Sequence, residues 1–237
     1  MTSNDCLILI PAYNEELSIT RVLKDLKMKT TDLPIDILVL DDGSTDATAE
    51  LAKAEDVKVL SLLTNVGNGG AVQTGFRYAV LNNYKYVMMF DADGQHDAGD
   101  VEKLLNCIEN NPCEMVIGSR YLNQRASNPT KLREIGTRLF SWIASKITKM
   151  EITDCTSGFR IINRKMFLFL AQKDHYPQKY PDADFIIMMG KQGFKVKEVY
   201  VDMHEREKGT SMHKGILRPV VYSLVMLTNI MCILLNS

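Results

Sequence analysis

The chain has 237 residues, of which 46% are hydrophobic and 24% charged, a composition ordinary for a globular protein with an ample core. The formal net charge of −1 provides no overall attraction to nucleic acid, so we expect no nucleic-acid partner. Its five cysteines share no metal-ligand spacing or disulfide-like framework, which favours a reducing, cytoplasmic setting. We expect no signal peptide, because the first residues lead into a short apolar run and then a helix.

Short apolar runs alternate with helical patterns through the first half of the chain. The candidate strands are 6–12, 35–42, 57–62, 86–93 and 114–119, and they are too continuously apolar for a half-exposed sheet. Helical spacing covers 15–29, 45–54, 70–82 and 97–110, with Ser44 or Thr45 and Asp97 as candidate N-caps. This alternation predicts an α/β fold with a mostly parallel, doubly wound sheet, whose ligand lies at the carboxyl ends of the strands.

The second half changes character. Between Ser119 and Lys149, seven basic residues stand against Glu134 alone, a local net charge of +6 that can meet anionic lipid or phosphate or form a solvated face. Residues 131–150 have an apolar stripe with the single tryptophan, which predicts a helix that lies in a membrane interface or packs on the protein's own sheet. A loop at 153–163 leads into a strand, followed by a helix at 181–191 and a strand at 194–201.

The C-terminal segment 219–237 is strongly apolar, but its apolar run of about 16 residues is short of the roughly 20 that a spanning helix needs. We interpret it as a helix on a membrane or against a partner, with a buried core helix as the alternative. The predicted division is a catalytic domain at 1–215 and an apolar C-terminal helix at 216–237.

Two aspartates, Asp91 and Asp93, directly follow the fourth apolar run. In an extended chain residues i and i+2 point the same way, so both carboxylates can aim at one point. Carboxylates suit Mg²⁺ or Mn²⁺, and substrate phosphates commonly complete the shell of such an ion. The spacing therefore predicts a seat for a metal diphosphate, although aspartates also simply end strands in turns.

Three further loops fall at the same predicted edge: PAYNEE (11–16), DDGSTD (41–46) and NVGNGGAVQTG (65–75). The first can stack on and hydrogen-bond a base. In the second, Asp42 can accept from a base N–H while Asp41 or Gly43 shapes the turn. The glycines of the third let backbone approach a ligand or a neighbouring helix closely, but the loop is neither a Walker motif nor a dinucleotide fingerprint.

Together these motifs resemble family 2 glycosyltransferases with the GT-A fold, and within them the polyprenyl-phosphate branch typified by dolichol-phosphate mannosyltransferases. Seven motifs occur in the family's order over about residues 5–215: PAYNEE, DDGSTD, the glycine segment, DADGQH (91–96), GSRY (118–121), TSGFR (156–160) and ER-x-x-G-x-S (205–211). The resemblance implies a Rossmann-like, mostly parallel sheet flanked by helices, with amphipathic or apolar helices toward the C-terminus.

The resemblance also implies roles for individual residues. The implied donor-binding residues are Pro11, Tyr13, Glu15, Asp42, Gly70 and Asp91. The implied metal ligands are Asp91, Asp93 and Gln95, and the implied contacts of the acceptor phosphate are Arg133, Thr137 and Arg206. The implied catalytic set is Asp93, Arg120, Asp184 and Arg206. Structural alternatives stay open: Arg120 can pair with an aspartate at the sheet edge, and Arg206 can be a surface loop residue.

The expected function is metal-dependent, inverting transfer of a sugar from a UDP- or GDP-sugar to polyprenyl phosphate, with Mg²⁺ or Mn²⁺ as cofactor. We expect a protein peripheral to the cytosolic membrane face, reaching the lipid through its basic helix, its C-terminal segment or a small membrane protein partner. The alternatives are a saccharide or lipid-linked sugar acceptor in surface polysaccharide biosynthesis, a nucleotidyltransferase, and a catalytically silent binding module. Asn68 and Met212 stand where many relatives have lysine, so a donor or phosphate contact can be lost or moved there.

Overall fold

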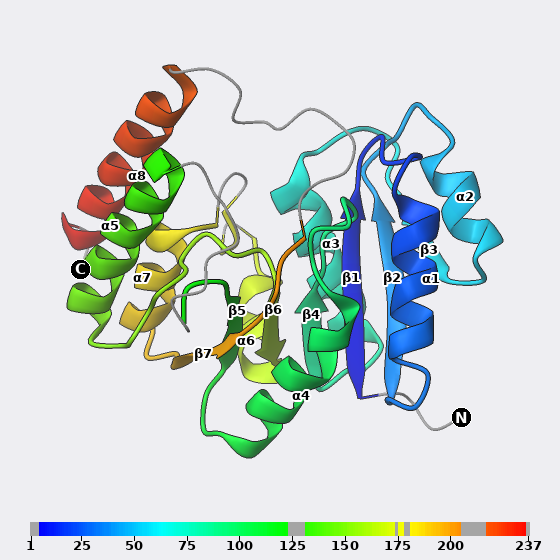
Figure 1. The fold of residues 1–237 in the computed structure, drawn as a ribbon, viewed down its shortest axis with the longest axis horizontal. Coiled ribbons are helices and arrows are strands. Elements are labelled where there is room, and N and C mark those ends of the chain that lie inside the picture. The colour runs from blue at the N-terminus through cyan, green and yellow to red at the C-terminus, as the bar shows by residue number, and fades with distance from the viewer. Residues whose placement is uncertain (1–4, 123–130, 174, 178–180, 205–216, 236–237) are drawn as a thin grey trace.

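The computed structural model describes residues 5–122, 131–173, 175–177, 181–204 and 217–235, without the side chains of 131–133 and 217–220. A seven-stranded sheet with the order β3-β2-β1-β4-β6-β5-β7 runs through it (Figure 1). The strands are β1 (Cys6–Ala12), β2 (Ile35–Asp41), β3 (Lys58–Ser61), β4 (Tyr86–Met89), β5 (Met115–Ser119), β6 (Arg160–Asn163) and β7 (Val196–Tyr200). Of these, β6 runs antiparallel to its neighbours and the other pairings are parallel, so the predicted α/β, mostly parallel sheet is confirmed.

The helices agree with the expected pattern except at a few points. They are α1 (Ile19–Lys29), α2 (Thr48–Ala54), α3 (Asn68–Leu81), α4 (Val101–Asn110) after a short 3-10 turn η1 (Ala98–Asp100), α5 (Lys131–Thr148), α6 (Arg164–Leu170), α7 (Ala183–Lys191) and α8 (Leu217–Leu235). The Asp97 cap is confirmed, since its carboxylate accepts from the Gly99 N–H. The Ser44 or Thr45 cap is wrong, because α2 begins later, with Ala47 at its N-cap.

The short helix α6 was not expected from the sequence. Its residues RKMFLFL are apolar and follow β6 directly, so they have no helical spacing that a seven-residue window can show. The helix begins where the Asn163 carboxamide oxygen accepts from the Met166 N–H, a cap that also ends β6.

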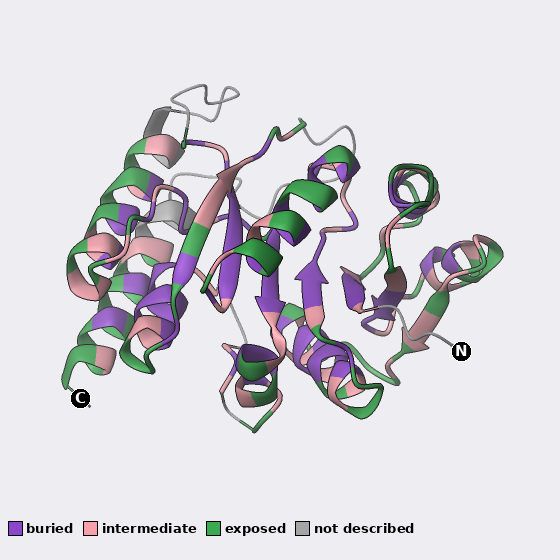
Figure 2. Ribbon diagram, turned by 90° about the horizontal axis from the view of Figure 1, so that it is seen from below, coloured by how far each residue is buried: buried purple, intermediate pink, exposed green. Residues whose placement is uncertain are grey.

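The sheet is buried on both faces, and alternate residues of β1 enter two separate cores. Cys6, Ile8 and Ile10 pack with α1, α2 and α4, whereas Leu7 and Leu9 pack with α3 and the helices of the second half. Figure 2 shows the buried strands between these two helical layers. A continuous apolar run such as CLILI is therefore required by the position of β1 near the middle of the sheet.

The C-terminal helix α8 packs on α7 (Figure 1). The Asn229 carboxamide donates to Asp184 Oδ2 over 2.8 Å, and the Tyr222 hydroxyl donates to the Asp182 carboxylate. This helix has one face buried on the protein itself and an opposite, exposed apolar face, so it is not a fully buried core helix. That it lies on a membrane or against a partner stays a prediction. No helix in the described ranges has the length and apolarity to cross a bilayer. The predicted domain boundary at 215/216 falls outside the described residues.

Candidate active site

The turns that follow β1 and β2 hold each other by reciprocal hydrogen bonds. The Asn14 N–H donates to Ser44 Oγ (3.1 Å), and the Thr45 N–H donates to Asn14 Oδ1 (2.9 Å). The Glu15 N–H donates to Thr48 Oγ1 over 2.8 Å. Asn14 has φ = +56°, a left-handed conformation that asparagine tolerates, and it turns the chain out of β1 toward the second loop. Hydrogen bonds to polar side chains therefore fix the two turns relative to each other.

Asp42 organises the glycine loop. Its Oδ1 accepts from the Val66 N–H (2.8 Å) and its Oδ2 from the Gly67 N–H (2.9 Å), so the carboxylate holds the chain that enters α3. This is a structural role beside the predicted contact with a base. The neighbouring turn is shaped as expected: Asp41 Oδ1 accepts from the Ser44 N–H. Gly43 has φ = +69°, and a Cβ there would lie 2.8 Å from the Thr64 carbonyl carbon.

The other expected donor residues gather at the same edge. Pro11 lies half-buried near the end of β1, Tyr13 is exposed just beyond it, and Gly70 lies in the first turn of α3. The Glu15 carboxylate accepts from the Ser18 hydroxyl over 2.9 Å. The predicted convergence of these loops at the carboxyl ends of β1 and β2 is therefore confirmed as a placement. Their contacts with a donor stay a prediction.

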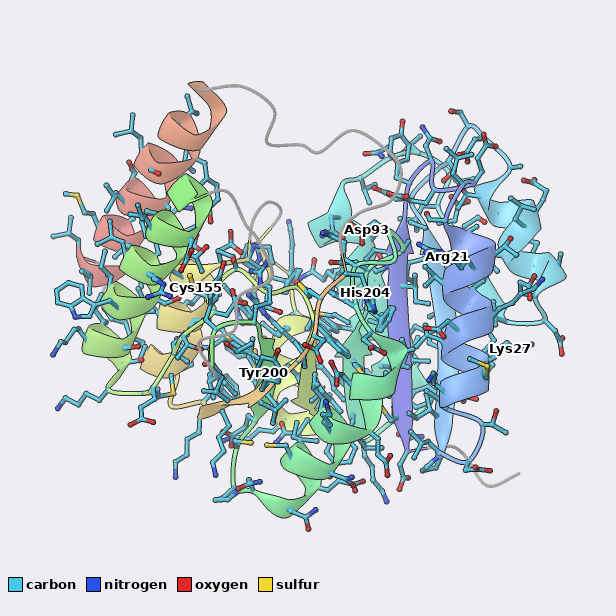
Figure 3. The ribbon with its side chains drawn as sticks, in the orientation of Figure 1. Arg21, Lys27, Asp93, Cys155, Tyr200 and His204 are labelled. Carbon is cyan, nitrogen blue, oxygen red and sulfur yellow. The ribbon has the colours of Figure 1, made fainter. Side chains whose placement is uncertain are left out.

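Asp91 and Asp93 lie in a turn beyond β4. That strand ends at Met89, so the expected extended run to residue 93, and with it the argument from i and i+2 spacing, is wrong. The physical reason is local: Asp93 Oδ1 accepts from the Gln95 N–H over 3.0 Å, a side-chain to backbone bond that stabilises a turn in place of a strand. Figure 3 shows Asp93 near His204, at the end of the sheet where β1 terminates.

The buried side chain of His96 stabilises this turn. Its Nδ1 accepts from the Asp91 N–H (3.1 Å), and its ring stacks on Phe159 with centroids 4.8 Å apart. Burial lowers the pKa of His96 to about 4, so the ring is neutral near pH 7 and Nδ1 is the acceptor. Nε2 lies 3.3 Å from Asp91 Oδ2 without the alignment of a hydrogen bond. The imidazole thus fixes the backbone of Asp91 and lies beside its carboxylate.

These residues fit a hard divalent cation that takes only part of its shell from protein. The Asp91 side chain is 43% exposed, and Asp93 and Gln95 are partly exposed. Carboxylate and amide oxygens are the donors that Mg²⁺ and Mn²⁺ prefer. Within the described residues, no three His, Cys, Asp or Glu side chains form a metal cage. Oxygens from a diphosphate would complete such a site.

Arg120 forms a buried ion pair. Its Nε donates to Asp154 Oδ2 (2.7 Å) and its Nη2 to Asp154 Oδ1 (2.8 Å), with side-chain exposures of 13% for Arg120 and 0% for Asp154. Burial raises the pKa of the Asp154 carboxyl, but the hydrogen bonds and charge of Arg120 outweigh it and hold that pKa below its usual range. Arg120 thus pairs with an aspartate, as its structural alternative proposed, and Asp154 fixes the orientation of its guanidinium.

A second carboxylate lies behind this pair. Glu198 of β7 accepts from the Thr153 N–H (2.9 Å) and from the Asp154 N–H (3.0 Å). Burial raises the pKa of the Glu198 carboxyl above its usual range, with the Thr153 hydroxyl partly opposing the shift. The backbone of the 153–154 turn is thus held by β7, and the turn in turn holds Arg120.

The TSGFR loop joins the two sides of the site. Thr156 Oγ1 accepts from Arg120 Nη2 (2.7 Å) and lies 3.4 Å from Thr137 Oγ1 of α5. Two residues on, Gly158 approaches Asp91 so closely that a Cβ would lie 3.0 Å from Asp91 Oδ2. The TSGFR loop therefore lies between two expected groups of the site: Arg120 and Thr137 on one side and Asp91, an expected metal ligand, on the other.

The remaining expected residues are placed less directly. Both oxygens of Asp184 are engaged, by the Phe185 N–H and the Asn229 carboxamide, and burial raises the pKa of its carboxyl. Arg206 and the side chain of Arg133 lie outside the described residues. The described residues before Arg206 end beside the 91–95 turn, where the His204 N–H donates to the Gln95 carbonyl over 2.8 Å.

Sequence reasoning missed the supporting residues Asp154, Glu198 and His96 as members of the site. Asp154 stands two residues before Thr156 of TSGFR, and His96 closes DADGQH, so proximity to a motif was an available signal. Glu198 lies in a strand of ordinary pattern, and only the sheet order β5-β7 brings it to Asp154.

Comparison with known proteins places this site in a family. The sequence model of glycosyl transferase family 2 matches residues 7–169. A UDP-N-acetylglucosamine–dolichyl-phosphate N-acetylglucosaminyltransferase of Methanococcus voltae is 28% identical over 93% of this chain and 94% of its own length. An undecaprenyl-phosphate mannosyltransferase of Micrococcus luteus is 30% identical over 88% of this chain and 87% of its own.

A solved structure extends the comparison to the fold. Glucosyl-3-phosphoglycerate synthase of Mycobacterium tuberculosis, in complex with Mn²⁺ and UDP-glucose, superposes with a TM-score of 0.70 at 18% identity, over 94% of this chain and 78% of that one. The expected GT-A fold is thereby confirmed. Together, the family match, the relatives and the fold support the resemblance to the polyprenyl-phosphate branch, and the chain belongs to glycosyl transferase family 2 as a glycosyltransferase.

Proposed function

We propose that this glycosyltransferase moves a sugar, with inversion, from a UDP- or GDP-sugar to polyprenyl phosphate at the cytosolic face of a membrane, with Mg²⁺ or Mn²⁺ bound at Asp91, Asp93 and Gln95. The observation that carries the proposal is the TSGFR loop, where Thr156 contacts Arg120 and Thr137 while Gly158 touches Asp91. Support also comes from the two relatives over nearly their full length, both of which are named as transferases to polyprenyl phosphates.

The reaction is a substitution at the anomeric carbon. An oxygen of the acceptor phosphate attacks, the bond from the anomeric carbon to the donor diphosphate breaks, and its electrons remain on the departing nucleoside diphosphate. Attack from the face opposite the leaving group inverts the centre. A phosphate nucleophile is already an anion near neutral pH, so a general base is not required and positioning does most of the work.

The chain's own residues divide into two groups under this proposal. The loops after β1 and β2 position the nucleoside, while Arg120, held by Asp154, offers a fixed positive charge beside the acceptor phosphate. Asp91, Asp93 and Gln95 would hold a divalent ion, which would supply a countercharge for the negative charge on the leaving diphosphate. Asp184 needs no proton transfer role here, which agrees with its engagement by Phe185 and Asn229.

The test is a donor screen. Purified protein with Mn²⁺ or Mg²⁺, a short-chain polyprenyl phosphate and a panel of UDP- and GDP-sugars is assayed for released nucleoside diphosphate, with and without the lipid. We expect lipid-dependent release that falls at least about a hundredfold in Asp93→Ala. The control is Asp32→Ala, an exposed aspartate before β2, at the edge of the sheet away from the site.

A second comparison tests the acceptor class. With a phosphate acceptor, Arg206→Ala should lose turnover while Asp184→Asn retains it, because no hydroxyl proton has to be removed. The opposite ranking would move the acceptor to a saccharide hydroxyl. Donor binding without lipid-dependent release would also contradict polyprenyl phosphate as the acceptor.

A further inference from the structure

The outer side of α8 is an unusual surface for a globular protein. Opposite the residues that pack on α7, it exposes Val221, Leu224, Leu227, Met231 and Leu235, with Leu224 60% and Met231 62% exposed. The hydroxyl of Thr228 on this side donates to the Leu224 carbonyl and so is satisfied within the helix. Residues 219–235 contain no Asp, Glu, Lys or Arg. Contiguous apolar patches of this kind mark interaction sites.

The neighbouring helix α5 extends this surface. Ile135, Leu139 and Trp142 follow each other at i, i+4 and i+7 and are exposed, Trp142 by 59%. The two helices lie side by side (Figure 1) and meet where Phe140 packs edge-to-face on Tyr222, with ring centroids 6.3 Å apart. We call the exposed residues of both helices the α5–α8 face.

Basic residues border the apolar part of the α5–α8 face. Lys146 lies one turn beyond Trp142 on the same side of α5, and Lys149 follows the helix; both are exposed. Arg138 flanks the stripe and pairs with Glu134 over 2.7 Å. An apolar centre with a tryptophan and lysines at its border matches a bilayer surface, where acyl chains receive the apolar side chains and anionic headgroups receive the lysines.

The helix α8 is held along the protein by polar contacts on its inner side. Asn229 donates to Asp184 over 2.8 Å, Tyr222 donates to Asp182, and Lys191 Nζ donates to the Ile233 carbonyl near the helix end. These contacts are spaced over three turns of the helix, so they fix its orientation as well as its position. The apolar outer side of α8 therefore faces away from the rest of the protein.

We propose that the α5–α8 face docks on an anionic membrane surface, with α8 lying in the plane of the bilayer and Trp142 at the boundary of headgroups and acyl chains. This inference rests on the proposed function, which requires access to a lipid acceptor. A second copy of the chain is the competing occupant. A two-fold contact through this face would bring equivalent lysines toward each other, whereas an anionic headgroup layer complements their charge.

The chain carries its own probe, because Trp142 is the single tryptophan. Full-length protein is titrated with vesicles of phosphatidylcholine and phosphatidylglycerol, and with vesicles of phosphatidylcholine alone. We expect a blue shift of the Trp142 emission, quenching by brominated lipids, and weaker binding to the uncharged vesicles or at high salt.

Substitutions distinguish binding through this face from nonspecific adsorption to vesicles. The double variant Leu224→Asp/Met231→Asp should bind the anionic vesicles at least about tenfold more weakly, because carboxylates enter both the apolar and the anionic layer. Leu63→Asp/Leu81→Asp changes two leucines outside the face that are even more exposed than Leu224 and Met231, and it should bind as the wild type. Circular dichroism checks that both variants fold.

The outcomes distinguish docking from catalysis. Leu224→Asp/Met231→Asp should keep its turnover with a water-soluble, short-chain phosphate acceptor while it loses vesicle binding. A wild type with no emission shift on vesicles would overturn the docking proposal and leave the transferase proposal standing. An emission shift that grows with protein concentration in the absence of vesicles, together with dimer formation in analytical ultracentrifugation, would overturn it in favour of self-association. Vesicle binding without any transfer to a lipid phosphate would contradict the proposed function alone.

Discussion

On the side where we propose that the donor binds, called the donor side below, the turns after β1 and β2 hold each other mainly through hydrogen bonds. Backbone N–H groups donate there to short polar side chains such as Asn14, Ser44 and Thr48. On the side where we propose that the acceptor binds, called the acceptor side below, the turns are held instead by the buried charges of Arg120 and Asp154, with Glu198 accepting from the Asp154 N–H. A neutral hydrogen bond contributes about 0.5–1.5 kcal/mol net, whereas leaving one partner of a buried ion pair alone costs about 3–5 kcal/mol. The two sides should therefore differ in how well they tolerate change.

The largest expected effect is at Asp154. Asp154→Ala leaves the Arg120 guanidinium buried without its carboxylate, and we expect the free energy of unfolding to fall by about 3–5 kcal/mol. Urea unfolding followed by circular dichroism measures it. Turnover should fall as well, because Arg120 loses the two hydrogen bonds that orient it.

A control separates the broken pair from the lost side chain. In Arg120→Met/Asp154→Leu, apolar groups replace both charges, so the double variant should be more stable than Asp154→Ala while it remains inactive. A loss below about 1 kcal/mol in Asp154→Ala would show that the pair is solvated and would remove the contrast between the two sides.

An intermediate effect is expected at Asp42, the buried carboxylate of the donor side. Asp42→Ala leaves the Val66 N–H without its partner, while the Gly67 N–H keeps Asn65 Oδ1, so we expect a loss of about 1–3 kcal/mol in the free energy of unfolding. The KM for the donor should rise because the glycine loop is no longer held. Asp42→Asn retains one acceptor oxygen and should lose less; equal losses in both variants would contradict this role.

The difference between the sides also explains what the sequence could predict. Parallel strands buried on both faces follow from runs such as CLILI, and the convergence of PAYNEE, DDGSTD and DADGQH follows from that topology. The contacts that link Arg120, Asp154 and Glu198 could not be predicted, because they depend on the pairing of β7 with β5. These two strands are about 80 residues apart in the sequence. The sequence pattern wrongly predicted strand as far as Asp93, because the apolar run ends at Phe90 and a local side-chain bond of Asp93 stabilises a turn beyond it.

A pH profile sharpens the comparison, because the acceptor side contains carboxyls with opposite shifts. Burial raises the pKa of Asp184, whereas the pKa of Asp154 is lowered. The contribution of Asp184 to the free energy of unfolding is complete below its unfolded pKa of about 4 and is lost as the pH rises through its higher folded pKa. As the pH rises from about 4 to about 7, the free energy of unfolding measured in urea should therefore fall less for Asp184→Asn than for the wild type. Parallel profiles would show that Asp184 is charged at no cost.

The smallest effect is expected at Asn14, where the donor side is most exposed. Asn14→Ala removes the bond from the Thr45 N–H and places a Cβ-bearing residue without a polar side chain at φ = +56°, and we expect a loss of about 1–2 kcal/mol. Asn14→Gly removes the same bond but adopts the left-handed conformation readily, so it should lose about 0.5–1 kcal/mol. The difference in unfolding free energy between the two variants measures the cost of the left-handed backbone conformation for alanine. The loss of unfolding free energy in Asn14→Gly measures the contribution of the hydrogen bond. A loss in Asn14→Gly as large as that in Asp154→Ala would mean that exposed neutral bonds hold the donor side as firmly as buried charges hold the acceptor side.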